Sequence, residues 1–127
     1  MTRWMFISGA VSAALSVALG AFGAHALKAT LSPDLLSVFE TGCRYQMYHA
    51  LALLALSAVS TRRIGSFNLF RTAAFLFIAG TVLFSGSLYL YAGTGLRSIV
   101  MVTPIGGILF LAGWVVSILG AGKKEVQ

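Results

Sequence analysis

The residues with the clearest potential for chemistry are two histidines, His25 and His49, in a chain that is 58% hydrophobic and only 9% charged. They lie in the segments GAFGAHALK and YQMYHAL, which are otherwise rich in small or aromatic residues. An ionisable side chain inside a membrane is costly and by default marks a site. An imidazole, which titrates near neutral pH, could relay protons, line a polar path or bind a metal there.

His49 is expected to have polar neighbours. Tyr45 lies four residues earlier, so in a helix the two share a face, and the Tyr45 hydroxyl is expected to hydrogen-bond the imidazole. Counting the helical rise from the predicted inner boundary puts His49 at about 16 Å and Ser85 at about 21 Å. The predicted polar site consists of His49, Tyr45, Ser85, Ser87 and Gln46. The alternative is that His49 bonds a serine hydroxyl or a backbone carbonyl and simply ties two helices together.

A second group of polar residues is expected near the outer membrane boundary, because the same counting puts His25 about 31 Å above the inner one. This outer-end site consists of His25, Glu40, Arg44, Tyr89 and Thr103. Glu40 and Arg44 are spaced i,i+4 for an ion pair, and they form either a polar mouth or an ordinary interfacial extension. The depth offset of about 15 Å between the histidines argues against one haem or metal shared by both. No cofactor or metal site is predicted.

Four charge-free stretches must form the elements that position these residues. They are bracketed by basic residues and comprise Trp4 to Leu27, Tyr45 to Thr61, Thr72 to Leu96 and Ser98 to Gly122. A helix needs roughly 20 apolar residues to cross a hydrocarbon core of about 30 Å. The sequence therefore predicts an all-α polytopic membrane protein, a four-transmembrane-helix bundle in one domain, 1–127, with helices at about 4–26, 33–60, 71–92 and 104–121.

The distribution of the basic residues predicts the orientation. Cytoplasmic loops of membrane proteins are enriched in Lys and Arg. With both termini cytoplasmic, that side collects Arg3, Arg62, Arg63, Arg71, Lys123 and Lys124. The cations sit at the ends of apolar runs and not along one face, so the net charge of +6 does not indicate a nucleic-acid partner. A cleaved signal peptide ending at Ala24-His25-Ala26 is the alternative for the first segment.

Several residues mark expected helix ends. Ser32-Pro33-Asp34 supplies an N-cap, a tolerated proline and a first-turn acid, and Thr103-Pro104 is expected to start the last helix in the same way. Gly65 and Asn68 are expected in the turn before the third helix. Gly93 and Gly95 are expected to end that helix.

Small residues predict where helices approach closely, since glycine lets a neighbouring backbone come near. The glycines expected at helix contacts are Gly20, Gly23, Gly86, Gly106 and Gly107. A cofactor groove along the small residues of the first helix is the alternative. Cys43, the only cysteine, excludes an internal disulfide and is expected to be a packing residue.

The strings GAFGAHALK, YQMYHAL, LFSGSLYLYAG and TPIGGILFLAGW, in this order, cover all four predicted spans. In these motifs the chain resembles the YgdD-like family of small bacterial inner-membrane proteins, which also has mitochondrial relatives. The resemblance implies a four-helix, multi-pass protein of the cell inner membrane whose molecular function is unknown. It adds no reaction, and Cys43 belongs to none of its motifs.

Three classes of function follow from these patterns. The first is a non-enzymatic protein that organises the lipid bilayer or partner proteins, or assembles as a homo-oligomer, since no set of nucleophile, base and orienting group is evident. The second is a transporter or channel for a small molecule, ion or proton using His49, Tyr45 and Ser85. The third, less favoured, is haem or metal binding through His25 and His49. An enzyme has least support, because Ser85 has no base or acid on its own helix and only His49 could activate it.

Overall fold

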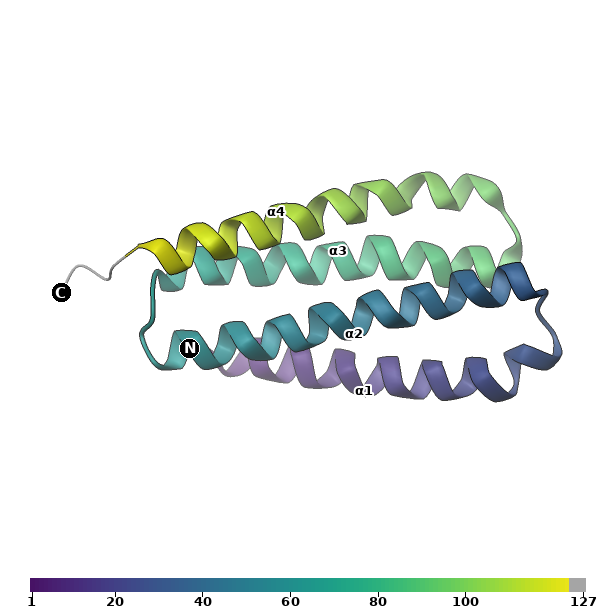
Figure 1. The fold of residues 1–127 in the computed structure, drawn as a ribbon, viewed down its shortest axis with the longest axis horizontal. Coiled ribbons are helices and arrows are strands. Elements are labelled where there is room, and N and C mark those ends of the chain that lie inside the picture. The colour runs from purple at the N-terminus through teal and green to yellow at the C-terminus, as the bar shows by residue number, and fades with distance from the viewer. Residues whose placement is uncertain (124–127) are drawn as a thin grey trace.

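The computed structural model describes residues 1–123, which form four long helices (Figure 1). These are α1 (Arg3–His25), α2 (Pro33–Thr61), α3 (Phe67–Thr94) and α4 (Thr103–Gly122). Two short 3-10 helices, η1 (Leu27–Ala29) and η2 (Arg97–Val102), lie in the first and third connections. The all-α fold is confirmed, and the predicted helix limits agree except that α3 begins four residues earlier than expected. Lys124 lies outside the described residues.

The helices lie side by side in chain order, each antiparallel to the next (Figure 1). The extensive contacts join α1 to α2, α2 to α3 and α3 to α4. Within the described part of the chain, α1 and α4 do not pack extensively on each other. The predicted bundle is therefore an open row, in which α2 and α3 are central and α1 and α4 are flanking helices.

Three of the four predicted helix-end motifs contain a residue that ends or begins a helix, or forms the turn, as expected. Ser32 caps α2, since its hydroxyl accepts from Leu35 N at 3.3 Å, and Pro33 begins the helix. Gly95 ends α3 in the left-handed conformation, with φ of 71°, and donates to Tyr91 O. Gly65 takes a φ of 73° in the α2–α3 turn, whereas Asn68 already lies within α3.

The prediction that Thr103 caps α4 is wrong. The cap position is Val102, which makes no side-chain hydrogen bond, and Thr103 is the first residue of the helix. Its hydroxyl lies 2.6 Å from the hydroxyl of Ser87 instead. A tertiary partner on α3 has taken the hydroxyl that the local pattern assigned to the helix end.

The contact between α3 and α4 is built from phenylalanine rings set against glycines. A Cβ added at Gly80 would lie 2.6 Å from the Phe110 ring, and one at Gly113 would lie 2.6 Å from the Phe77 ring. Gly106 faces the backbone of Phe84 so closely that no Cβ fits. These positions require glycine because the two helix backbones approach through them.

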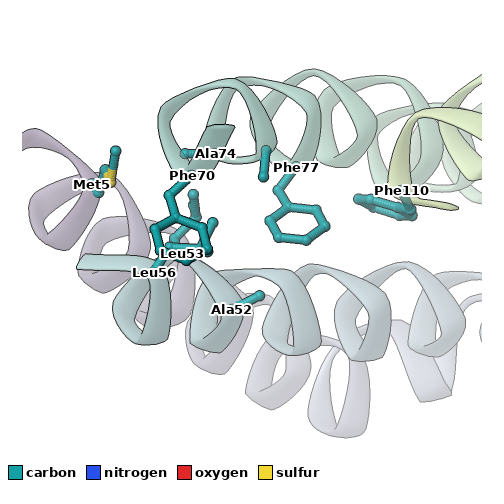
Figure 2. Packing of buried hydrophobic residues seen from close by; sticks show 9 residues of the cluster. Met5, Ala52, Leu53, Leu56, Phe70, Ala74, Phe77 and Phe110 are labelled. Carbon is teal, nitrogen blue, oxygen red and sulfur yellow. The ribbon is translucent and has the colours of Figure 1, made fainter. Parts of the chain in front are cut away.

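The main apolar core lies at the centre of the row (Figure 2). It joins Met5 of α1, residues of α2 such as Leu53, Phe77 of α3 and Phe110 of α4. Met5 and Phe77 are fully buried. α1 is therefore an integral part of the packed structure.

The predicted packing glycines divide into two groups. Gly23 packs against the ring of Phe39, Gly106 against Phe84, and Gly107 makes ordinary contact with Phe84. Gly20 and Gly86 have nothing within 4 Å of an added Cβ, so their assignment to helix contacts is wrong. Both sit on helix faces that the open row leaves without a neighbour.

Three segments are long and apolar enough to cross a membrane, by length and composition. They are Arg3–Ala29, Phe67–Thr94 and Arg97–Gly122. α2 is not among them, although it has 29 residues. Its middle carries the polar side chains of Tyr45, Gln46, Tyr48 and His49, which lower its hydropathy.

Candidate functional site

His49 lies in the interior between α2 and α4, with only 4% of its surface exposed. Its Nε2 accepts a hydrogen bond from the indole Nε1 of Trp114 at 3.2 Å. Its Nδ1 lies 2.8 Å from the carbonyl oxygen of Tyr45. Because an indole N–H can only donate, Nε2 must be unprotonated and Nδ1 must carry the proton that Tyr45 O accepts. The hydrogen-bond pattern therefore holds His49 as one neutral tautomer.

Aromatic rings enclose this imidazole on its other sides. It stacks on Phe110 with ring centroids 3.5 Å apart and planes 5° from parallel. Phe77 lies at 5.3 Å and Trp114 at 5.9 Å from the same ring. His49 lines a cavity of about 630 Å³ between α2 and α4, but with both nitrogens bonded it has no free lone pair for a metal or a substrate in this conformation.

The expected hydrogen bond between the Tyr45 hydroxyl and His49 is wrong. The backbone carbonyl of Tyr45 is the partner, and its side chain packs on Phe84 at 4.8 Å and against Tyr48 at 5.6 Å between ring centroids. Tyr45 is 37% exposed. Tyr45 and His49 do lie one helical turn apart, as the i,i+4 spacing predicts. That spacing also brings the backbone carbonyl of Tyr45 within reach of His49, and this carbonyl accepts the imidazole proton.

Ser85 does not meet His49 either. Its hydroxyl donates to the carbonyl oxygen of Gly42 at 2.7 Å and is almost completely buried. On the other side of α2, the Ser16 hydroxyl donates to Cys43 O, also at 2.7 Å. Two successive carbonyls of α2 thus accept hydroxyls from α3 and α1.

Gln46 is the residue that joins three helices. Its amide nitrogen donates to Ser12 O of α1 at 3.0 Å, and its amide oxygen accepts from the Tyr89 hydroxyl of α3 at 2.6 Å. Gln46 is 6% exposed. The sequence placed it in the His49 site, whereas the structure makes it the centre of a separate network on the opposite side of α2.

The remaining predicted residues lie in two further places. The Ser87 hydroxyl donates to Phe84 O at 2.8 Å, so in its contact with Thr103 the threonine is the donor. His25, Glu40 and Arg44 are exposed, toward the end of the row that lies opposite the amino terminus. The predicted outer-end site is therefore wrong as a unit, because Tyr89 and Thr103 are drawn into helix-to-helix bonds and the other three face outward.

Cys43 is a free, buried thiol in a small apolar cluster with Phe39 and Ala92. Tyr89 and Leu19 pack against the same cluster. Its interpretation as a packing residue is confirmed. Within residues 1–123, no group of three or more His, Cys, Asp or Glu side chains comes together to hold a metal.

Trp114 is the functional neighbour that sequence reasoning missed. Counted from the ends of their helices, Trp114 lies about 12 Å and His49 about 18 Å from the same end of the row, a gap that an indole bridges. A donor-only indole in an apolar helix needs an acceptor. The similar depths of the two residues along their helices are the sequence signal that indicates this pair.

Comparisons with known proteins place the chain in a family. The family model "Protein of unknown function (DUF423)" matches residues 19–107. That range is more than half of the 127 residues and includes Gln46, His49 and Ser85.

The chain belongs to the DUF423 family.

Similar proteins carry the UPF0382 name and are described as membrane proteins. The chain is 47% identical over 120 residues to the UPF0382 inner membrane protein YgdD of Escherichia coli K12, covering 94% of this chain and 90% of that protein. It is 47% identical over 117 residues to a UPF0382 membrane protein of Staphylococcus saprophyticus, covering 92% and 95%. The Bacillus subtilis protein YwdK is 41% identical over 117 residues, with 92% and 94% covered. No solved structure matches the chain.

The family resemblance expected from the motifs is confirmed. With its membrane-length apolar helices and its membrane-protein relatives, this member of the DUF423 family is a multi-pass protein of the inner membrane. The family description attaches no reaction to it. Function must be argued from the hydrogen-bonded interior.

Proposed function

We propose that this protein is a non-enzymatic, non-conducting structural protein that organises lipids or partner proteins in the inner membrane. The observation that carries the proposal is the closed state of its polar interior. Each buried polar residue bonds within the chain, and these residues are Ser16, Gln46, His49, Ser57, Ser85 and Ser87. In the described part of the chain, Ser60 Oγ is the one buried side-chain polar atom without a partner.

Hydrogen bonds of this kind are used to hold membrane helices together. Interhelical bonds from Ser, Gln and His side chains stabilise contacts that lipid tails cannot drive by the hydrophobic effect. Here they are concentrated on α2, which bonds α1 through Ser16 and Gln46, α3 through Ser85, and α4 through His49. The polar residues therefore act as joints between helices.

Catalysis has no support in this arrangement. A serine nucleophile needs a base within hydrogen-bond reach. The Ser85 hydroxyl donates to Gly42 O, and both His49 nitrogens are bonded to other groups. The transporter alternative has no continuous polar path here, since His49 and Ser85 do not bond each other and the Tyr45 ring packs on Phe84 and Tyr48.

We further propose that all four helices cross the membrane, with both termini cytoplasmic. Thr2 bonds Thr61, and Ser66 N bonds Gly120 O, so the amino terminus, the α2–α3 turn and the end of α4 share one end of the row. That end carries Arg3, Arg62, Arg63, Arg71 and Lys123, a bias typical of cytoplasmic loops. α2 crosses despite its polar residues because neighbouring helices satisfy them.

Flux measurements test the functional proposal. Purified protein is reconstituted into vesicles loaded with a pH-sensitive dye, and proton flux is followed from pH 5 to 8, the range in which histidine titrates. We expect the proton flux of vesicles that contain the natural protein or His49→Phe to equal the flux of empty vesicles. A flux that His49→Phe abolishes would overturn the proposal.

Cysteine labelling tests the topology. In a Cys43→Ala background, single cysteines at the exposed positions Thr30, Ile64 and Ser98 are treated with a membrane-impermeant maleimide on intact cells. We expect labelling at Thr30→Cys and Ser98→Cys and none at Ile64→Cys until the cells are opened. Labelling of Ile64→Cys together with Thr30→Cys on intact cells would contradict a membrane-spanning α2.

A further inference from the structure

A cleft between α1 and α3 is left open by the row arrangement. Both helices pack on α2, but in the described part of the chain they do not pack extensively on each other. Two cavities follow one another along this cleft. One, of about 500 Å³, lies at the basic end and is lined by Met1, Trp4, Phe67, Arg71 and Phe75. The other, of about 470 Å³, continues toward the middle, with walls that include Ser8, Val11, Ser12, Ile78, Thr81 and Val82.

The first cavity has a cation held over an aromatic pair. The guanidinium carbon of Arg71 lies 5.8 Å from the centre of the Phe75 ring. The same ring stacks on Trp4 of α1 at 4.9 Å, with planes 22° apart. Arg71 is exposed, so its donors are free to face a ligand at the mouth of the cleft. A guanidinium presents a planar fork of donors that matches two phosphate oxygens.

Charge around the mouth favours an anion. Arg3, Arg62, Arg63 and Lys123 lie at the same end of the row as Arg71, and all five are exposed. The acidic residues of the described chain, Asp34 and Glu40, lie in the first part of α2, toward the opposite end. Basic pockets between membrane helices at the cytoplasmic surface bind anionic lipid headgroups.

The second cavity has the depth and polarity of an acyl-chain groove. One leaflet contributes about half of the 30 Å hydrocarbon core, so a chain reaches about 15 Å inward. At 1.5 Å per residue, that distance runs from Arg71 to about Thr81 on α3. The polar groups on the floor, Gln46 and Ser85, are occupied by bonds to other helices, which leaves a mainly apolar surface.

We propose that the α1–α3 cleft binds one anionic phospholipid, with its phosphate on Arg71 beside the stacked rings of Trp4 and Phe75 and an acyl chain between Val11 and Val82. Phe75 and Val82, 52% and 65% exposed, offer the apolar contact that a lipid tail would cover. This lipid site rests on the proposed function, because it names an anionic phospholipid as the partner that the protein organises. A phospholipid is the ligand that fits, because a phosphate site and an acyl-chain groove lie next to each other in one cleft.

Lipid counting by native mass spectrometry tests the site. The full-length protein in detergent is incubated with equal amounts of phosphatidylglycerol and phosphatidylcholine carrying the same acyl chains. We expect phosphatidylglycerol to be retained about fivefold more, the ratio expected for one cation at a membrane surface. Arg71→Gln should bring this ratio to about one, and Arg71→Lys should leave it between the two values. Arg97→Gln, which changes an exposed arginine at the opposite end, should leave it unchanged.

The tail groove is tested separately with a bulky side chain. Val82→Trp should reduce the retention of both lipids, whereas Val115→Trp, at a similarly exposed position on α4, should not. The four substituted positions, Arg71, Arg97, Val82 and Val115, are exposed, so we expect the variants to keep the packed interior. Thermal unfolding of each variant checks this expectation.

Three outcomes would overturn the lipid site. Equal phosphatidylglycerol preference in Arg71→Gln and Arg97→Gln would show that Arg71 does not bind the lipid headgroup. Displacement of the lipid by millimolar inorganic phosphate would show a simple anion site. A change of oligomeric mass in Val82→Trp without a change in lipid would assign the cleft to a second copy of the chain. None of these outcomes alters the expected absence of proton flux, so the two proposals fail separately.

Discussion

Helices α2 and α4 differ in a way that reverses the usual relation between hydropathy and burial. Ten of the 29 residues of α2 are buried, against four of the 20 of α4. Yet α4, with η2, is apolar enough to cross a membrane by composition, whereas α2 is not. In lipid, the side chains that face outward must be apolar, and polar groups are tolerated only where protein satisfies them. Between these two helices, the one with the higher hydropathy is therefore the one more exposed to lipid.

The two helices are also held in place by different interactions. α4 docks on α3 through rings and glycines, such as Phe77 on Gly113. α2 is held by side-chain hydrogen bonds to α1 and α3, with Gln46 as the residue that bonds both. The contacts of α2 with α1 and α3 thus add several side-chain hydrogen bonds to the close packing at glycines that also joins α3 to α4.

The largest expected effect tests the packing side. Gly106→Ala places a methyl group against the backbone of Phe84, which cannot rotate away, so we expect a loss of about 3 kcal/mol in the free energy of unfolding. Unfolding in mixed micelles measures it. Gly86→Ala is the control, because nothing lies within 4 Å of its added Cβ, and it should cause no loss of stability, since alanine is the better helix former by up to about 1 kcal/mol. Equal stability of the two variants would contradict the backbone contact.

The second effect tests the hydrogen-bonded side. Gln46→Leu removes the bonds to Ser12 O and to the Tyr89 hydroxyl and leaves that partly buried hydroxyl without its partner, at a cost of about 2 kcal/mol. The same unfolding assay measures it. Adding Tyr89→Phe to Gln46→Leu should recover part of the loss, since no orphaned hydroxyl remains. Strictly additive losses in the double variant would show that the two side chains do not interact.

A smaller effect tests the bond between His49 and Trp114, which joins α2 directly to α4. Trp114→Phe removes the indole donor to His49 Nε2 and should cost about 0.6 kcal/mol, the average for a hydrogen bond between membrane helices. Combining it with His49→Phe in a double-mutant cycle isolates the coupling between the residues. Tyr45→Phe should be nearly neutral, because the Tyr45 carbonyl, and not its hydroxyl, bonds His49. Coupling of Tyr45 and not Trp114 to His49 would restore the partner expected from the sequence.

The smallest effect concerns the outer face of α4. Ile118 is 71% exposed, and Ile118→Ala should change stability by less than about 0.5 kcal/mol. Leu53→Ala, in the buried core, is the matched contrast and should cost at least about 2 kcal/mol. A large loss at Ile118 would indicate that a second copy or another protein covers this face.

Much of the architecture was predictable because helices in a membrane are local structures. Charge-free stretches, Ser32 before Pro33, and Gly95 after the third span fixed helix limits to within a few residues, since caps and spans depend on nearby sequence alone. The expected site was less predictable. Gln46, His49 and Ser85 are polar residues of the interior as predicted, whereas Tyr45 is exposed, and the partners expected for these residues were wrong or missing. Depth counting gives the level of a residue and not the direction in which its side chain points.

The sequence by itself determined an all-α membrane protein of the DUF423 family, with four helices and polar residues concentrated on the second. Only the tertiary structure decided that the helices form an open row, that His49 pairs with Trp114 and not with the Tyr45 hydroxyl, and that Gly86 lines the α1–α3 cleft while Gly106 meets a backbone. The physical reason is that helix formation and membrane crossing depend on interactions within a few residues. A hydrogen-bond partner or a close contact depends on the rotation of each helix about its axis, which packing against its neighbours sets.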